Sequence, residues 1–174
     1  MRLNLRTLLP VTLGVVTLAA CGVDIDFWDE RSFEVDVPEE SEKSVEKAID
    51  VDLKEHAEFK EKLTQLKDVD VVEIWLEVPA VDAANKATKV SGRLEVSGLE
   101  DDAEKILVAE YTDLAIGAGG KVQLEWDDEG YEKLKSFAFD APNQFRLHLS
   151  GSLDELPAKF TLETRLHVVA TVGL

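Results

Sequence analysis

The sequence is poor in the residues that build disulfides, metal centres and familiar active sites. Its 174 residues include one cysteine and three histidines. A single thiol cannot form a disulfide within the chain, and without a His-x-x-x-His spacing no zinc site is indicated. Neither a Gly-x-Ser-x-Gly nor a His-Glu-x-x-His motif occurs. We therefore predict a protein that is not an enzyme and uses neither a metal nor another cofactor.

Basic residues are also scarce. The chain has 36 Asp and Glu against 19 Lys and Arg, which gives a formal net charge of −17. Nucleic-acid binding needs Lys and Arg facing phosphates, so we predict no nucleic-acid partner. The same charge argues against electrostatic attraction of the whole chain to anionic lipid. A high-salt habitat is an alternative reason for the acidity.

The N-terminus lacks an apolar run long enough to cross a membrane, which takes about 20 residues in a helix. The apolar stretch 8–18 is shorter, and it follows two basic residues, Arg2 and Arg6. The small residues Ala19 and Ala20 come after it. A basic start, a short apolar middle and small residues before a cut site predict a secretory signal peptide over 1–20. The alternative is a strand or buried helix that ends at a cysteine.

The four residues Leu18-Ala19-Ala20-Cys21 resemble the lipobox of bacterial lipoproteins. The resemblance implies that the Cys21 thiol receives a diacylglyceryl group and that cleavage follows Ala20. The freed amine is then acylated, with palmitate as a typical chain. Two or three acyl chains hold a domain on a membrane for its lifetime, whereas one chain binds reversibly. Gly22, in place of the Asp that retains lipoproteins in the inner membrane of enteric bacteria, favours the outer membrane.

The mature chain is long enough for one domain with an adequate core. Removal of residues 1–20 leaves 154 residues and takes away two arginines but no acidic residue, so the net charge becomes −19. We predict a lipidated tether over 21–31, in which Phe27 and Trp28 dock on the domain or on the bilayer interface. Residues 32–174 then form the single folded domain.

Most of that domain shows the period of two that is typical of strands. Apolar and polar residues alternate in the runs 33–37, 49–53, 72–78, 90–96, 122–126, 145–149 and 160–172. The mixed apolar segment 106–116 is predicted to be a further strand and its extension. Two helices interrupt this pattern. One is predicted over 55–67, where His56 lies on the margin of an apolar face as a structural residue. The other begins at 127–129, because carboxylates there cap free N–H groups.

The connections predict two antiparallel hairpins. The runs 72–78 and 90–96 form the first, and the runs 145–149 and 160–172 form the second. A register that pairs Leu147 with Leu162 would place Arg146 opposite Glu163, where opposite charges stabilise a strand pair.

Three aromatic residues form the predicted binding surface: Phe27, Trp28 and Trp75. Trp75 lies on the polar side of its strand, so it is either an exposed binding aromatic or covered by a loop or neighbouring strand. His148 and His167 also lie on polar sides. A metal site between them is an alternative that their spacing does not favour.

We therefore predict an all-β, antiparallel β-sandwich of about seven or eight strands with two short crossover helices. Its pattern is loosely similar to uncharacterised secreted β-sandwich domains. The predicted function is a non-enzymatic, lipid-anchored cell-envelope module, held in the membrane by the acyl chains of Cys21, that binds a protein partner or serves an assembly. The alternatives are a carrier of a small apolar molecule or lipid, and an uncharacterised hydrolase.

Overall fold

The computed structural model describes residues 22–100, 102–117 and 119–173. The signal peptide over 1–20 and the lipid attachment at Cys21 lie outside these residues. Within them the chain forms eight strands, which are β1 (Val23–Val37), β2 (Ser44–Asp52), β3 (Leu66–Val81), β4 (Lys89–Ser97), β5 (Ile106–Ala115), β6 (Gly120–Gln123), β7 (Gln144–Leu153) and β8 (Ala158–Val172). Two α-helices join them, α1 (Ala57–Lys62) and α2 (Asp128–Phe139). None of the described helices is long and apolar enough to span a bilayer.

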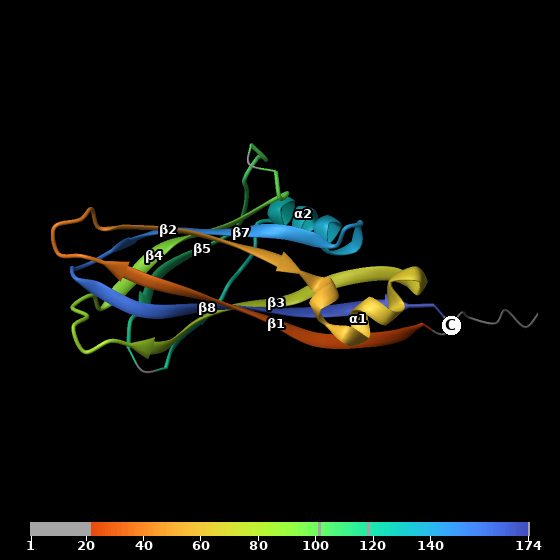
Figure 1. The fold of residues 1–174 in the computed structure, drawn as a ribbon, viewed down its shortest axis with the longest axis horizontal. Coiled ribbons are helices and arrows are strands. Elements are labelled where there is room, and N and C mark those ends of the chain that lie inside the picture. Colours follow the sequence, from red (N-terminus) through yellow and green to blue (C-terminus); the bar gives the residue numbers. More distant parts are fainter. Residues whose placement is uncertain (1–21, 101, 118, 174) are drawn as a thin grey trace, which may run out of the picture.

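The strands form two packed four-stranded sheets, as the sequence predicts (Figure 1). Sheet 1 has the order β1-β8-β3-β6, and sheet 2 has the order β2-β7-β4-β5. All strand pairs are antiparallel. This order is that of a jelly roll, in which two Greek keys interleave.

The core fills the space between the sheets. Strand β8 shows how the sequence builds it, because every second residue from Ala158 to Val172 is buried and the residues between them are partly or fully exposed. Leu162 and Leu166 have no exposed surface at all. Burying one such side chain contributes about 1.5–3 kcal/mol. The matching positions of the other strands join the same continuous apolar cluster.

The predicted tether over 21–31 is wrong from residue 23 onward. Strand β1 already begins at Val23, which pairs with Val172, and it continues to Val37. The physical reason is that the alternation of 33–37 extends back through Phe27 and Ile25, which pack against the core. Asp24, Asp26 and Glu30 lie on the other side of the strand, whereas Asp29 lies on the inward side. The folded domain therefore starts two residues after Cys21.

The two predicted hairpins are also wrong. Strands β3 and β4 lie in different sheets, and so do β7 and β8. Arg146 faces Asp50 of β2, with Nε 2.6 Å from the carboxylate oxygen Oδ1, and it does not pair with Glu163. In the jelly roll most connections cross from one sheet to the other, and only β4 and β5 are neighbours both in sequence and among the described strand pairs.

One predicted helix begins where the sequence indicates, and the other is shorter than predicted. Asp127 caps α2 as expected, because its carboxylate accepts hydrogen bonds from the backbone N–H groups of Glu129 and Gly130. At the other end of α2, the Asn143 amide donates to the carbonyls of Ala138 and Phe139. The helix predicted over 55–67 contains only six α-helical residues, between two short 3₁₀ turns, because residues from 66 onward belong to β3.

The elongated molecule has two different ends (Figure 1). We call the first the helical end: it holds the start of β1, the end of β8, α1 and α2. The second, the loop end, holds the connections 38–43, 82–88 and 154–157 and the residues 116–117 after β5. Both ends of the described chain lie at the helical end, since Val23 pairs with Val172.

Candidate functional site

Sheet 1 brings together two of the three aromatic residues that the sequence singled out. Trp28 of β1 and Trp75 of β3 both lie on the surface of the sheet that faces away from the core, on either side of β8. Arg165 of β8 pairs in register with Trp75, and His167 pairs with Trp28. We call this surface the tryptophan face; it consists of Trp28, Trp75, Lys121, Arg165 and His167 with the carboxylates Asp26, Glu30, Glu73 and Glu77.

Trp28 is held by two side chains of β8. The His167 ring stacks on the indole, with ring centroids 4.4 Å apart and planes inclined by 12°. The guanidinium of Arg165 lies 5.0 Å from the indole centroid, which is a cation–π distance. Arg165 also pairs with Glu30 at 2.7 Å, and the Nε2 atom of His167 lies 2.7 Å from a carboxylate oxygen of Asp26. Trp28 is therefore half-buried among charged groups.

Trp75 has the same kind of surroundings. The ammonium of Lys121, on the neighbouring strand β6, lies 4.2 Å from its ring centroid, and its indole N–H donates to Glu73 at 2.7 Å. Trp75 is thus half-buried, with Lys121 of the neighbouring strand beside one face of its indole. Lys121 also reaches Glu77 at 2.5 Å, and Arg165 reaches the same carboxylate at 3.2 Å. Hydrogen bonds from Lys121 and Arg165 lower the pKa of Glu77.

Phe27 does not belong to this surface, which corrects the prediction. Adjacent residues of a strand point to opposite sides, so Phe27 points inward where Trp28 points outward. Its ring packs against the rings of His56 and Phe59, with centroid distances of 4.3 and 5.7 Å. Phe27 thus fastens the segment around α1 to sheet 1, and His56 has the structural role that the sequence predicts.

A buried carboxylate beside Phe27 is a residue that the sequence analysis missed. Asp29 is 2 % exposed, and it pairs with Arg31 through two hydrogen bonds of 2.8 and 2.9 Å. The Nε2 atom of His56 lies 3.0 Å from the same carboxylate. Arg31 continues to Glu55 at 2.9 Å, and the hydrogen bond to Asp29 raises the pKa of the guanidinium. The sequence signal that could have revealed it is the parity of Asp29, which places it on the same inward side of the strand as Phe27 and Phe33.

The structure separates His148 from His167, which lie in different sheets. His148 Nε2 instead lies 2.9 Å from the hydroxyl oxygen of Ser97, a pair that the sequence did not reveal. Burial lowers the pKa of His148. Among the described residues, no group of three or more His, Cys, Asp and Glu side chains is arranged to hold a metal ion.

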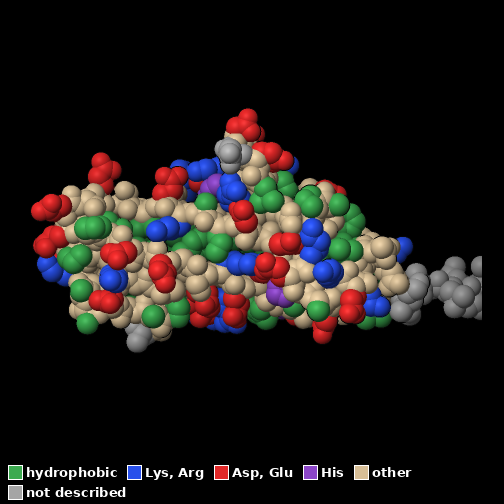
Figure 2. Space-filling model, in the orientation of Figure 1, with side chains coloured by type: hydrophobic (Ala, Val, Ile, Leu, Met, Phe, Trp, Pro, Cys, Tyr) green, Lys and Arg blue, Asp and Glu red, His purple; other side chains and the backbone are tan. Residues whose placement is uncertain are grey.

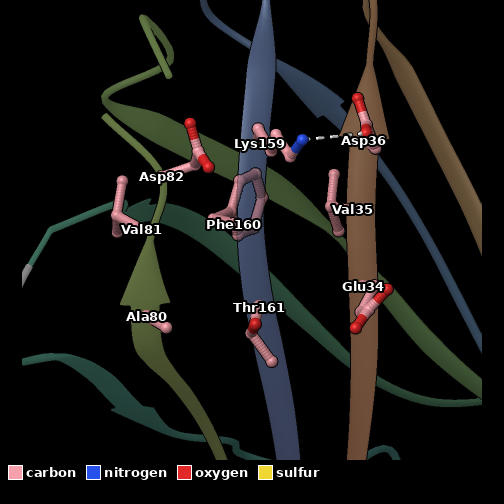
Figure 3. Close-up of a pocket in the computed structure, with 9 residues that line it drawn as sticks. All are labelled: Glu34, Val35, Asp36, Ala80, Val81, Asp82, Lys159, Phe160 and Thr161. Carbon is pink, nitrogen blue, oxygen red and sulfur yellow. Dashed lines mark ion pairs between the residues drawn. The ribbon is translucent and has the colours of Figure 1, made fainter. Parts of the chain in front are cut away.

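An open hollow at the loop end has a different composition (Figure 3). It has a volume of about 370 Å³, and β1, β3 and β8 line it. Phe160 and Val35 are almost fully buried within it, whereas Val81 is 39 % exposed. The carboxylates of Glu34, Asp36 and Asp82 surround it, and Lys159 pairs with Asp36 at 3.5 Å. The hollow is therefore acidic and shallow.

Comparison with known proteins finds no family whose model matches the chain and no matching curated protein. Several solved structures have a similar outline. One from Desmodium yellow mottle tymovirus is 10% identical and covers 98% of this chain and 97% of its own, with a TM-score of 0.41. The decameric BFDV capsid protein is 10% identical, with coverages of 85% and 99% and a TM-score of 0.40. Turnip yellow mosaic virus gives 9% identity, coverages of 88% and 95%, and a TM-score of 0.38.

Proposed function

We propose that this protein is a non-enzymatic, lipid-anchored module of the bacterial cell envelope that binds a protein partner through the tryptophan face. One observation carries the choice of surface. The two tryptophans that the sequence marked as candidate binding residues converge on one face, with Arg165 between their strands. Tryptophan and arginine are enriched among the residues that contribute most to protein–protein binding.

The anchor is proposed from the lipobox-like residues Leu18-Ala19-Ala20-Cys21. Gly22 after the cysteine favours the outer membrane. Because β1 begins at Val23, a lipid on Cys21 would hold the folded domain directly at the membrane, without a tether.

The charges of the tryptophan face favour a partner with a basic surface. Carboxylates outnumber the permanent cations, Lys121 and Arg165, and those at its edge, Asp26 and Glu30, have exposed side chains. The whole chain has a net charge of −17, which accelerates the encounter with a positively charged surface. A lysine or arginine of the partner can pair with these carboxylates while an apolar side chain covers an indole.

The packed interior of the sandwich argues against a carrier of a small apolar molecule or lipid. A carrier needs a cavity between its sheets, and this space is occupied by one continuous cluster of buried side chains. The hollows lined by β1, β3 and β8, and by Leu63, Leu66 and Phe139, open on the outside of the molecule.

A hydrolase is the second alternative, and the contact between Ser97 and His148 is the observation in its favour. Two facts weaken it. Ser97 is only 2 % exposed, and its hydroxyl donates to the Gly98 carbonyl at 2.7 Å instead of to His148. The carboxylates Asp50 and Glu77 are also unsuited to proton transfer near neutral pH, because hydrogen bonds from cationic side chains lower their pKa values.

The proposal is tested by recovering the mature protein from solubilised native envelopes and measuring the acyl mass on Cys21 in the same material. Trp28→Ala with Trp75→Ala removes both indoles of the tryptophan face. Trp126→Phe is the matched control, because Trp126 stacks on Tyr131 and contacts the core away from that face. Cys21→Ala serves as the mislocalised control. We expect the wild type and Trp126→Phe to retain one stoichiometric partner that the double variant loses.

Other outcomes decide between the alternatives. Recovery of lipid alone by an acylated protein favours the carrier. A partner that binds the double variant equally well places the binding surface elsewhere. Hydrolysis that disappears in Ser97→Ala favours the enzyme. An unmodified Cys21 with residues 1–20 still attached contradicts the lipoprotein.

A further inference from the structure

The helical end carries exposed apolar side chains that the fold itself does not cover. Val23, the first residue of β1, is 49 % exposed, and Phe139, the last residue of α2, is 39 % exposed. Between α2 and the start of β3 lies an open hollow of about 280 Å³. Its lining residues come from both sides of this end: Leu63, Thr64, Leu66, Phe139, Ala141 and Asn143.

Lysines without an acidic partner lie beside these apolar residues. Lys60, Lys62 and Lys67 are exposed, and no ion pair within the described part of the chain includes them. The segment 60–67 contains three lysines and one glutamate, although the whole chain is strongly acidic. Exposed carboxylates lie in the same region, at Glu58, Glu61 and Asp68, so this end carries both signs. The three lysines without ion pairs, beside apolar side chains, are the groups that can face lipid headgroups.

The loop end differs in how its lysines are paired. Its lysines are engaged with acidic partners, Lys86 with Glu39 at 3.1 Å and Lys159 with Asp36 at 3.5 Å. The connection 38–43 contains three glutamates and one lysine. Figure 2 shows acidic side chains projecting at the loop end and side chains of both signs near the helical end.

The position of Cys21 connects the helical end with a membrane. Cys21 precedes Gly22 by one peptide, so their Cα atoms are about 3.8 Å apart. Val23 is the outermost paired residue of β1, and its partner Val172 also pairs with Leu66. An acyl chain on Cys21 thus enters the bilayer beside the exposed apolar residues. Because β1 is paired from Val23 onward, only Gly22 separates Cys21 from the first strand.

We propose that the helical end rests on the bilayer to which Cys21 is anchored, with the long axis of the sandwich standing away from the membrane. In this orientation Val23, Leu63 and Phe139 contact the headgroup region, and the three lysines face lipid phosphates. The acidic loop end and its hollow point away from the negatively charged surface, and the tryptophan face stands upright beside the membrane. This inference rests on the proposed acylation of Cys21.

Two labelled variants test the orientation. With Cys21 acylated, a new cysteine is the only free thiol in the chain. Thr64→Cys at the helical end and Glu40→Cys at the loop end each receive a polarity-sensitive fluorophore. Both proteins are reconstituted in vesicles of phosphatidylethanolamine and phosphatidylglycerol. We expect the emission at position 64 to shift to the blue and to be quenched by brominated lipid, and the emission at position 40 to do neither.

A charge variant provides the matched comparison. Replacing Lys60, Lys62 and Lys67 together by Gln is expected to reduce the blue shift at position 64. Replacing the loop-end residues Lys43, Lys86 and Lys159 by Gln is expected to leave it unchanged. If an acylated protein floats with the vesicles but the two labels behave alike, the orientation is wrong and the lipoprotein proposal stands. If Cys21 stays unacylated in cells, both proposals fall.

Discussion

The two ends of the sandwich are held together by different interactions. At the helical end, α1 and α2 pack on the sheets through buried groups, including the Phe27 and Phe59 rings and the carboxylate of Asp29. At the loop end, exposed carboxylates tie one connection to another, as Asp154 does with Thr88 and Lys89. The end held by buried groups is the one at which β1 begins, at Val23.

The largest expected difference in unfolding free energy between the two ends comes from removing one carboxylate at each end of β1. Asp29→Ala leaves Arg31 mostly buried without its main partner, and Arg31 is 17 % exposed. Breaking a buried ion pair from one side costs about 3 kcal/mol of unfolding free energy. Glu34→Ala, near the other end of β1, removes an exposed carboxylate and should cost at most about 0.5 kcal/mol. Urea unfolding of both variants measures this. Equal losses would show that the helical end does not depend on its buried charge.

Glycines at the two ends offer the next comparison. A Cβ atom added to Gly130, in the first turn of α2, would lie 1.7 Å from the backbone oxygen of Leu107. Gly130→Ala therefore forces α2 away from β5, and we expect a loss of about 2 kcal/mol. At Gly117, after β5 at the loop end, an added Cβ meets nothing within 4 Å. Gly117→Ala should change stability by at most about 0.5 kcal/mol. Thermal unfolding of the pair is the measurement, and an unaffected Gly130→Ala would contradict close packing of α2.

Much of the fold was predictable from local patterns, and the reason is visible in single elements. The strand predicted over 106–116 is β5, and the predicted cap at 127 is the N-cap of α2. Alternation and capping depend on residues a few positions apart. Strand pairing does not. The hairpins failed because the jelly roll pairs β3 and β1 with β8, far along the chain, instead of with their sequence neighbours.

The candidate site was predictable to the same extent. Period two placed Trp75 on the polar side of its strand, and this is where it lies. Nothing local could bring it near Trp28, because their proximity depends on β8 pairing with both strands. Asp29 was missed for a related reason. A short acidic segment resembles a solvated tether. Only when Phe27, Asp29 and Arg31 are recognised as alternate residues of one strand does the inward position of Asp29 become clear.

The smallest expected difference concerns pH at the loop end. Burial opposes ionisation of Asp154, but hydrogen bonds from Thr88 and Lys89 outweigh it and lower its pKa to about 2. A lowered carboxylate pKa stabilises the fold fully above the unfolded-state value of about 3.9, and this stabilisation is lost as the pH falls toward 2. Asp154→Asn should therefore cost about 0.5–1 kcal/mol at neutral pH, because the contacts are exposed.

The cost of Asp154→Asn should shrink as the pH falls from 5 toward 2. The neighbouring exposed residue Glu155, changed to Gln, is the control and should show no such trend. Urea midpoints of the three proteins across this range give the comparison. A constant difference between wild type and Asp154→Asn would mean that hydrogen bonding to the ionised carboxylate does not hold the connection 154–157 to β4. The loop end would then depend on backbone pairing alone, such as the Leu153 N–H bond to the Lys43 carbonyl at 2.9 Å.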